Sequence, residues 1–245
     1  MAQIDVKQLS EKLLAKDYPE KDVKRFLAYV DNAIREEANK DAEKKAVTKN
    51  NTDALYSLAV KYFNMGVVID GVNAVVSGYN MVMVTYHGYK NAVLRAYPEA
   101  ELDIQLVRQG DTFTFAKESG SVVYSHQIAD PFENEEKEII GAYFVAKTKR
   151  GEFLETLNKT DFQKMKKASK MTYLWDSWAS EFWLKSVIKR GCKRHFYDVV
   201  AEIDEQDNED FGIEEKVKAS DNKKADIIAK AKANGNTPQR PAEQS

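Results

Sequence analysis

The stretch WDSWASEFWLKSVIKRGCKRHF, from Trp175 to Phe196, constrains this chain most, because it predicts one helix with two chemically different sides. At 100° per residue, a stripe of apolar and small residues faces the core, and cations at four-residue steps face the other side. The stripe comprises Leu184, Val187, Ile188, Gly191 and His195, and the basic side comprises Lys185, Lys189 and Lys193, with Arg190 and Arg194 beside them. Asp176 or Ser177 is expected to cap this helix at its N-terminus. The pattern therefore predicts a basic ridge on a partly buried helix.

Aromatic residues are predicted on the same side as the lysines. Trp175, Trp178 and Phe182 project there, which suits a groove for nucleic acid lined by rings and cations. A solvated lysine face with core tryptophans explains the helix alone equally well. The surrounding charge favours the groove, because thirteen Lys and Arg stand against five acids from Phe144 to His195 in a chain of net charge -2. Further candidate DNA contacts in this basic block are Lys147, Lys149, Lys164, Lys167 and Lys170.

The same tract resembles the RecT and Redβ phage recombinases, a family that anneals complementary single strands of DNA without ATP. The resemblance rests on Trp175, Phe182 and the run Lys185-Ser186-Val187-Ile188-Lys189-Arg190 followed by Lys193. Two upstream pieces, Gly141-Ala142-Tyr143-Phe144-Val145-Ala146-Lys147 and Tyr89-Lys90, extend it over roughly residues 52–196. The chain departs from the family at Asn91, where the family has glycine, and at His195-Phe196, where it has Leu-Pro.

The resemblance implies properties that the residues alone do not. It places Tyr89 and Lys90 in the DNA groove and predicts assembly of protomers into rings or helical filaments on DNA. It also implies contacts between the C-terminal part and partner proteins, with the host single-strand binding protein and a phage exonuclease as candidates. The cytoplasm of a bacterial host is the expected location.

Composition limits the remaining classes of protein. With 43% hydrophobic and 31% charged residues, the sequence is typical of a soluble protein, and no apolar run approaches the roughly 20 residues of a membrane span. No signal peptide is recognisable at the start. Cys192 is the only cysteine, which excludes a disulfide framework and favours a reducing compartment.

Three regions are predicted: residues 1–50, residues 51–200 and residues 201–245. Residues 1–50 are predicted to form charged helices. These helices either belong to the fold or contact a neighbouring protomer, and we expect the protomer contact. The second is the DNA-binding core, with helices at about 52–64 and 86–95 and a helix capped by Thr160. The third is an acidic linker and a flexible tail. The acids of residues 198–215 are simply solvated, compete with DNA for the groove or repel adjacent subunits.

Between the helices, the apolar period changes to the alternation typical of strands. The predicted strands span residues 102–106, 113–115, 122–128, 138–148 and 152–157, with turns at Gly110, Gly120 and Gly151. Successive strands joined by short turns predict an antiparallel meander. The expected fold class is therefore α+β, with an antiparallel β-meander sheet packed with helices. The resemblance to the RecT family implies a RecT/Redβ-like and distantly Rad52-like core.

The sequence gives little support to an enzyme. His87, His126 and His195 are isolated, and no phosphate-binding glycine loop is present, so neither catalysis nor ATP binding is expected. An acid cluster at Asp130, Glu133, Glu135 and Glu136 is most simply solvated, although a divalent cation could modulate the protein there. A DNA binder needs only cations and stacking surfaces. The alternatives to annealing are a passive single-strand coat protein and a non-catalytic scaffold whose basic face binds an acidic partner.

Overall fold

The computed structural model describes residues 4–37, 40, 45–78, 81–118, 121–132, 137–169 and 172–210. The chain divides into two units, Met1–Asp204 and Glu205–Ser245. The description below concerns the first unit, which contains all the residues of the candidate site. Within the described part of the chain, no helix combines the length and apolar character that crossing a membrane requires.

Three N-terminal helices pack on one another within the first unit: α1 (Val6–Leu14), α2 (Glu20–Glu37) and α3 (Thr52–Asn64). Asp5 caps α1, accepting a 3.0 Å hydrogen bond from the backbone N–H of Gln8. The apolar stripes of α1 and α2 are buried at Leu9, Leu13, Val23, Phe26 and Val30, and Phe26 contacts Phe63 of α3 edge to face. These stripes therefore stabilise the chain's own fold. Contacts between protomers through residues 1–50 stay a prediction, and they would have to use other faces of these helices.

A short hairpin leads into the helix that later flanks the site. Strands β1 (Ala74–Gly78) and β2 (Met81–Val84) pair antiparallel, and α4 (Tyr86–Ala96) follows with Thr85 as its N-cap. Gly88 lies against the backbone of this hairpin, since a Cβ there would sit 2.4 Å from the carbonyl oxygen of Asn73. Only glycine allows α4 to approach the hairpin so closely.

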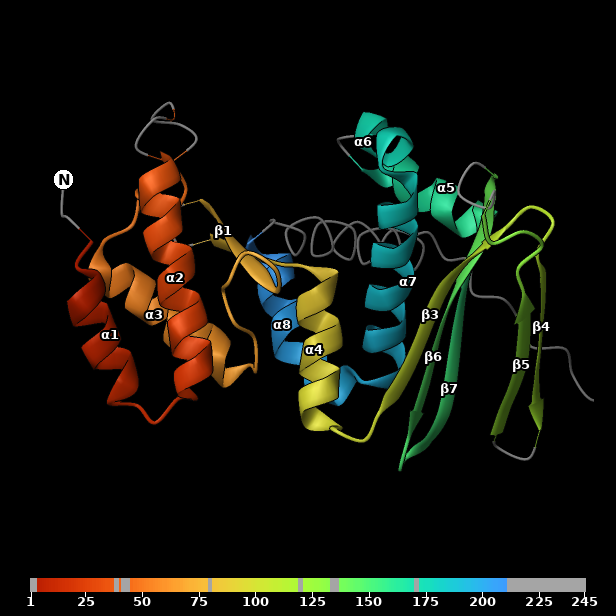
Figure 1. Cartoon of the computed structure of the whole chain (residues 1–245), viewed down its shortest axis with the longest axis horizontal. Coiled ribbons are helices and arrows are strands. Elements are labelled where there is room, and N and C mark those ends of the chain that lie inside the picture. The colour runs from red at the N-terminus through yellow and green to blue at the C-terminus, as the bar shows by residue number, and fades with distance from the viewer. Residues whose placement is uncertain are drawn as a thin grey trace, which may run out of the picture. The chain divides into compact units, whose positions relative to one another are not determined.

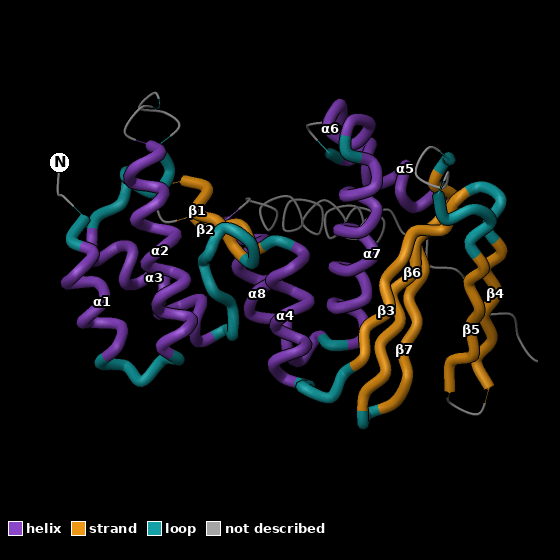
Figure 2. The backbone as a smooth tube through the Cα atoms, viewed as in Figure 1, coloured by secondary structure: helices purple, strands orange, loops and turns teal. Residues whose placement is uncertain are grey.

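The central sheet has three antiparallel strands in the order β3 (Glu101–Arg108), β6 (Ile139–Thr148) and β7 (Gly151–Asn158). Strands β4 (Thr112–Glu118) and β5 (Ser121–Gln127) pair only with each other within the described residues, as the separate ladder in Figure 2 shows. The predicted α+β class with antiparallel strands is confirmed. The predicted strand order of a simple meander is wrong, because β3 pairs with β6 and the β4–β5 hairpin lies outside that sheet.

The β4–β5 hairpin packs on the sheet through a small cluster of its own. Phe113 stacks on Tyr143 of β6, with ring centroids 4.7 Å apart and planes 12° from parallel. Tyr124 donates a 2.6 Å hydrogen bond to Asp103 of β3, which also accepts one from Tyr143. Side-chain contacts thus attach the β4–β5 hairpin to the sheet, because its strands form no backbone ladder with the sheet in the described residues.

The predicted single helix over residues 175–196 is two helices, α6 (Thr172–Ser177) and α7 (Ala179–His195). The break falls at Trp178, whose φ of -126° and ψ of 42° are not helical. Trp175 and Phe182 stack with centroids 4.6 Å apart, whereas seven residues of unbroken helix would separate them by about 10 Å along the axis. The chain therefore bends to bring the two rings together.

Two predicted caps are corrected by these helix boundaries. The N-cap of α7 is Trp178 without a side-chain hydrogen bond, so neither Asp176 nor Ser177 caps it. Helix α5 (Lys159–Ala168) starts earlier than expected, and Asn158, rather than Thr160, accepts the capping bond from the Asp161 N–H over 2.8 Å.

Helix α7 lies between α4 and the sheet β3–β6–β7, as Figure 1 shows. Its buried residues are Trp183, Val187, Ile188, Gly191 and Cys192. A Cβ on Gly191 would lie 2.5 Å from Cδ1 of Phe144 on β6, so glycine lets the helix sit directly on the strand. The last helix, α8 (Tyr197–Asp210), adds Val200 and Ile203 to the same core, which thus extends past residue 200.

Candidate nucleic-acid interface

Three lysines of α7 follow one another at four-residue steps, about 6 Å of helix each, and every ammonium group lies over an aromatic ring. Lys185 Nζ is 5.5 Å from the centroid of Phe182, and Lys189 Nζ is 4.6 Å from that of Tyr89. Lys193 Nζ is 6.0 Å from the same Tyr89 ring. These distances are within the range of cation–π attraction. The predicted ridge of Lys185, Lys189 and Lys193 is therefore present and is held in place by rings.

The ridge borders a groove with a volume of about 410 Å³. Its wall includes the stacked pair Trp175 and Phe182, from α6 and α7, and Met165 from α5. The remaining lining residues are Lys185, Ser186, Lys189, Arg190, Lys193 and Arg194. Cations beside an apolar, ring-bearing surface suit a strand with a charged backbone and flat bases. We call this feature the α7 groove.

Arg190 and Arg194 also line the groove, but their guanidinium groups have carboxylate partners inside the chain. Arg190 lies 2.6 Å from Glu155 Oε1 through Nε and donates a 2.8 Å bond to Asp161 through Nη1. Arg194 contacts both oxygens of Glu155. The bond from Arg190 holds the pKa of Asp161 below its usual value. Both arginines thus fasten α7 to β7 and α5, and direct contact with DNA stays a prediction for them.

Tyr89 and Lys90 occupy different environments on α4. Tyr89 is fully buried, so in this structure it offers no open face on which a base could stack, contrary to the expectation that it lines the groove. Its ring instead carries the ammonium groups of Lys189 and Lys193. Lys90 is half-buried on the same helix and is absent from the groove lining within the described residues.

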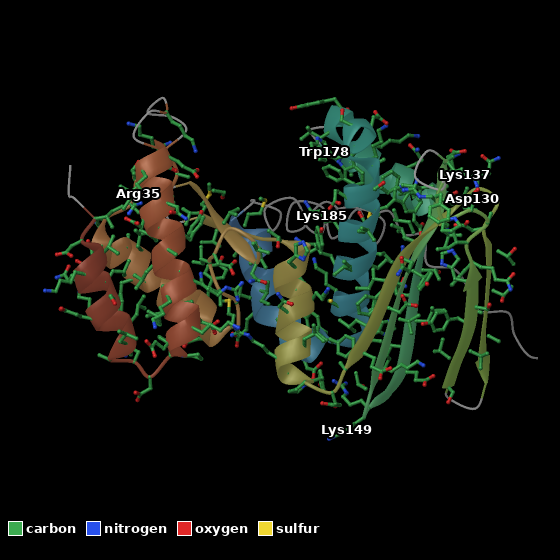
Figure 3. The ribbon with its side chains drawn as sticks, in the orientation of Figure 1. Arg35, Asp130, Lys137, Lys149, Trp178 and Lys185 are labelled. Atoms are coloured by element: carbon green, nitrogen blue, oxygen red, sulfur yellow. The ribbon has the colours of Figure 1, made fainter. Side chains whose placement is uncertain are left out.

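Trp178 differs from the other two predicted aromatics. It is 62% exposed at the break between α6 and α7, where Figure 3 shows it at the top of α7, and it is not among the described residues that line the groove. Of the three aromatic residues predicted in this tract, Trp175 and Phe182 line the groove beside the lysines.

The other predicted cations lie on separate elements. Lys164 and Lys167 are exposed on α5, which contributes Met165 to the groove. Lys149 lies at the tip of the β6–β7 hairpin, away from Trp178 in Figure 3. Lys147, also exposed, pairs in register with Glu101 on one side and Glu152 on the other, which offsets its charge. Lys170 lies outside the described residues.

The sequence reading missed Met165 and Glu155 as contributors to the site. Nothing local in the sequence marks them, because each meets the ridge through tertiary packing. The structure also has a second cavity of about 440 Å³, where Phe162, Trp175 and Trp183 meet Arg108 and Lys166. The rings of Phe162 and Trp183 stack with centroids 4.2 Å apart, and both residues are buried. Trp175 packs against Phe162 of this pair.

The acidic residues and histidines of the part of the chain that the structure describes do not form a metal-binding cluster. No group of three or more His, Cys, Asp or Glu residues there is arranged to hold a metal ion. Of the predicted acid cluster, Glu133, Glu135 and Glu136 lie outside the described residues. The histidines have separate settings: His87 stacks on Tyr86, His126 lies 3.4 Å from Asp111, and His195 lies 3.6 Å from Glu155.

Comparison with protein families agrees with this geometry. The model of the RecT family matches residues 60–227, more than half of the chain and the whole of the α7 groove. The searches of curated proteins and of solved structures gave no match. The matched region contains the basic ridge, its supporting aromatic residues and the sheet on which α7 lies. The chain belongs to the RecT family of single-strand annealing proteins, which bind single-stranded DNA in recombination.

Proposed function

We propose that this protein anneals complementary single strands of DNA without ATP, as an assembly of protomers, in phage recombination. The observation that carries the proposal is the α7 groove, where three ring-supported lysines line a wall formed by the Trp175–Phe182 stack. Lysines bind phosphates whatever the base sequence, and aromatic rings stack on any base. Such a surface suits a protein that must accept every complementary pair.

In the proposed mechanism, the first strand lies along the lysine ridge with its phosphates toward Lys185, Lys189 and Lys193. The bases stay accessible to a second strand, and Trp175 and Phe182 stack against one of them. Pairing itself supplies the driving free energy, on the order of 1.4 kcal/mol per base-pair step of DNA stacking. Hydrolysis of a nucleotide is then unnecessary, which is consistent with the lack of a phosphate-binding glycine loop in the sequence.

Assembly follows from the size of the groove. Helix α7 has 17 residues and is about 25 Å long, so one protomer covers only a few nucleotides. Annealing over useful lengths therefore needs protomers side by side, as rings or helical filaments. The solvent-facing sides of α1 and α2 are our candidates for contacts between protomers.

The proposed setting is the cytoplasm of a bacterial host. A divalent cation modulates binding at most, and no cofactor is required. The proposed partners are the host single-strand binding protein and a phage exonuclease, in addition to DNA and other copies of this chain.

The test mixes the protein with complementary oligonucleotides that carry a fluorophore and a quencher, without nucleotide, and follows both annealing and assembly, the latter by electron microscopy. We expect quenching faster than the spontaneous rate and assemblies that grow when the strands are added in succession. A requirement for ATP, or a protein that stays monomeric with both strands present, would contradict the proposal.

The two alternatives give different outcomes in the same experiment. A passive coat protein binds both strands but slows their pairing. A scaffold for an acidic protein has no preference for DNA over an acidic polypeptide at equal salt concentration. Acceleration of pairing thus separates an annealing protein from both alternatives.

A further inference from the structure

We infer that Tyr89 is a positioning residue of the DNA interface: its buried ring holds the ammonium groups of Lys189 and Lys193 at the edge of the α7 groove, without touching DNA. This inference rests on the proposed function of that groove. Tyr89 lies on α4 and is fully buried, whereas the two lysines lie on α7, the helix packed beside α4.

The geometry places one ring under two charges. Lys189 Nζ is 4.6 Å and Lys193 Nζ is 6.0 Å from the ring centroid, so the same ring attracts both. The two residues are four apart on α7, so the ring spans one helical turn of the ridge. The ring has no net charge, so the positive charge of both ammonium groups is kept. Attraction to the ring and to DNA can therefore act together.

The effect expected on binding is conformational. A lysine side chain has four rotatable bonds, and binding a phosphate with an unrestrained side chain costs rotamer entropy. A ring that already restricts two such side chains removes part of this cost before DNA arrives. Loss of the ring should therefore weaken DNA binding although both lysines and their charges remain.

A purely structural role for Tyr89 would give a different result. Tyr89 also fills space between α4 and the rest of the core, so its replacement disturbs packing. A packing defect would weaken binding equally whether or not Lys189 and Lys193 are present. A positioning role requires that the effect of Tyr89 disappear when these lysines are replaced.

The binding experiment is a double-mutant cycle with single-stranded oligonucleotides at low salt concentration. We expect Tyr89→Leu to weaken binding about threefold to tenfold and Tyr89→Phe, which keeps the ring, to bind like the unmodified protein. In a Lys189→Met, Lys193→Met background, Tyr89→Leu should have no further effect. Tyr62→Leu, which removes a buried tyrosine of α3, is the matched control and should leave binding unchanged. Equal effects of Tyr89→Leu in both backgrounds would overturn the inference.

A second measurement needs no DNA. In protein with ¹³C-labelled lysine, ring currents should shift the side-chain resonances of Lys189 and Lys193 away from those of exposed Lys24. The shifts should persist in Tyr89→Phe and vanish in Tyr89→Leu; if Tyr89→Leu does not fold, Tyr89→Met replaces it. Absence of the shifts in the unmodified protein would overturn the inference. If the shifts are present but replacing both lysines leaves DNA binding unchanged, the proposed function of the groove fails while the ring–lysine contact stands.

Discussion

Arg194 on α7 donates from Nη1 to both carboxylate oxygens of Glu155 on β7, over 3.0 and 3.1 Å. Glu155 is almost completely buried and also receives Arg190 at 2.6 Å. One acid of the sheet therefore holds two of the five cations that the sequence places on the basic side of the helix. The interface thus separates into lysines that face the groove and arginines that anchor the helix beneath it.

We expect Glu155→Gln to lower the free energy of unfolding by about 1 to 3 kcal/mol, because it removes the charge that both arginines contact. Loss of one member of a buried ion pair costs more, but Arg194 is 57% exposed and solvent screens part of the interaction. Denaturant unfolding at pH 7 measures the change. The matched control is Glu138→Gln, which breaks an exposed pair with Lys159 and should change stability by less than about 0.5 kcal/mol. Equal effects of the two replacements would contradict the anchoring role.

His195 gives this contact a dependence on pH. Burial lowers the pKa of His195 below 6.5, against the opposing attraction of Glu155. The unfolded chain then binds a proton more readily than the folded one. The contribution of His195 to the free energy of unfolding is therefore fully present above pH 6.5 and is lost as the pH decreases below that value. We expect His195→Gln to reduce the slope of unfolding free energy against pH below pH 6.5. An unchanged slope, measured by denaturant titration at several pH values, would mean that His195 has the same pKa in both states.

The sequence predicts those features that depend on neighbours along the chain. The helix at about residues 52–64 and the buried face of Val187 and Ile188 follow from local periodicity, and the structure agrees with both. The same periodicity places the three lysines correctly. A stripe needs only the geometry of one helix, so no knowledge of the fold is required.

Features that depend on distant residues were not predictable in this way. The break at Trp178 lets Trp175 stack on Phe182 and contact Phe162, and the pairing of β3 with β6 passes over the β4–β5 hairpin. Arg190 resembles a surface cation in sequence, yet Glu155 lies 35 positions upstream, on a strand that only the fold brings near. Alternating strands and charged helices do not specify these partners.

The lysine ridge and the arginine anchors should differ in salt dependence. For single-stranded DNA, the slope of log K against log salt concentration becomes shallower by about 0.7 for each phosphate contact that is removed. We expect Lys185→Ala with Lys189→Ala to reduce the slope by about 1.4 while stability is kept. Arg190→Ala should chiefly lower stability, because it breaks the pairs with Glu155 and Asp161.

The control for the lysine pair is Lys21→Ala with Lys24→Ala, on exposed positions of α2. This variant loses the same charge without touching the α7 groove. An identical fall in slope for both pairs would show that net charge, rather than the ridge, determines binding.

The aromatic residues of the tract should not contribute equally. We expect Trp175→Ala or Phe182→Ala to weaken single-strand binding by about 1 to 3 kcal/mol, the usual value of one base stacked on a ring. Trp178→Ala should cost less than about 0.5 kcal/mol, because this exposed ring does not line the groove. Fluorescence titration with an unstructured oligonucleotide measures each. A larger loss at Trp178 than at Trp175 would place the strand across the break between α6 and α7 instead.

A protein ending at residue 210 should fold and anneal purified oligonucleotides like the full chain. The buried core of the described residues extends to Ile203, and beyond Phe211 the sequence has no aromatic residue and few apolar ones to add to it. Calorimetric unfolding and the fluorescence annealing assay, with both proteins at equal concentration, measure the two properties. If the shortened protein unfolds at the same temperature but no longer pairs complementary strands, the C-terminal segment itself takes part in annealing. If it anneals normally but loses binding to the host single-strand binding protein, the segment acts in partner contact, as the family resemblance implies.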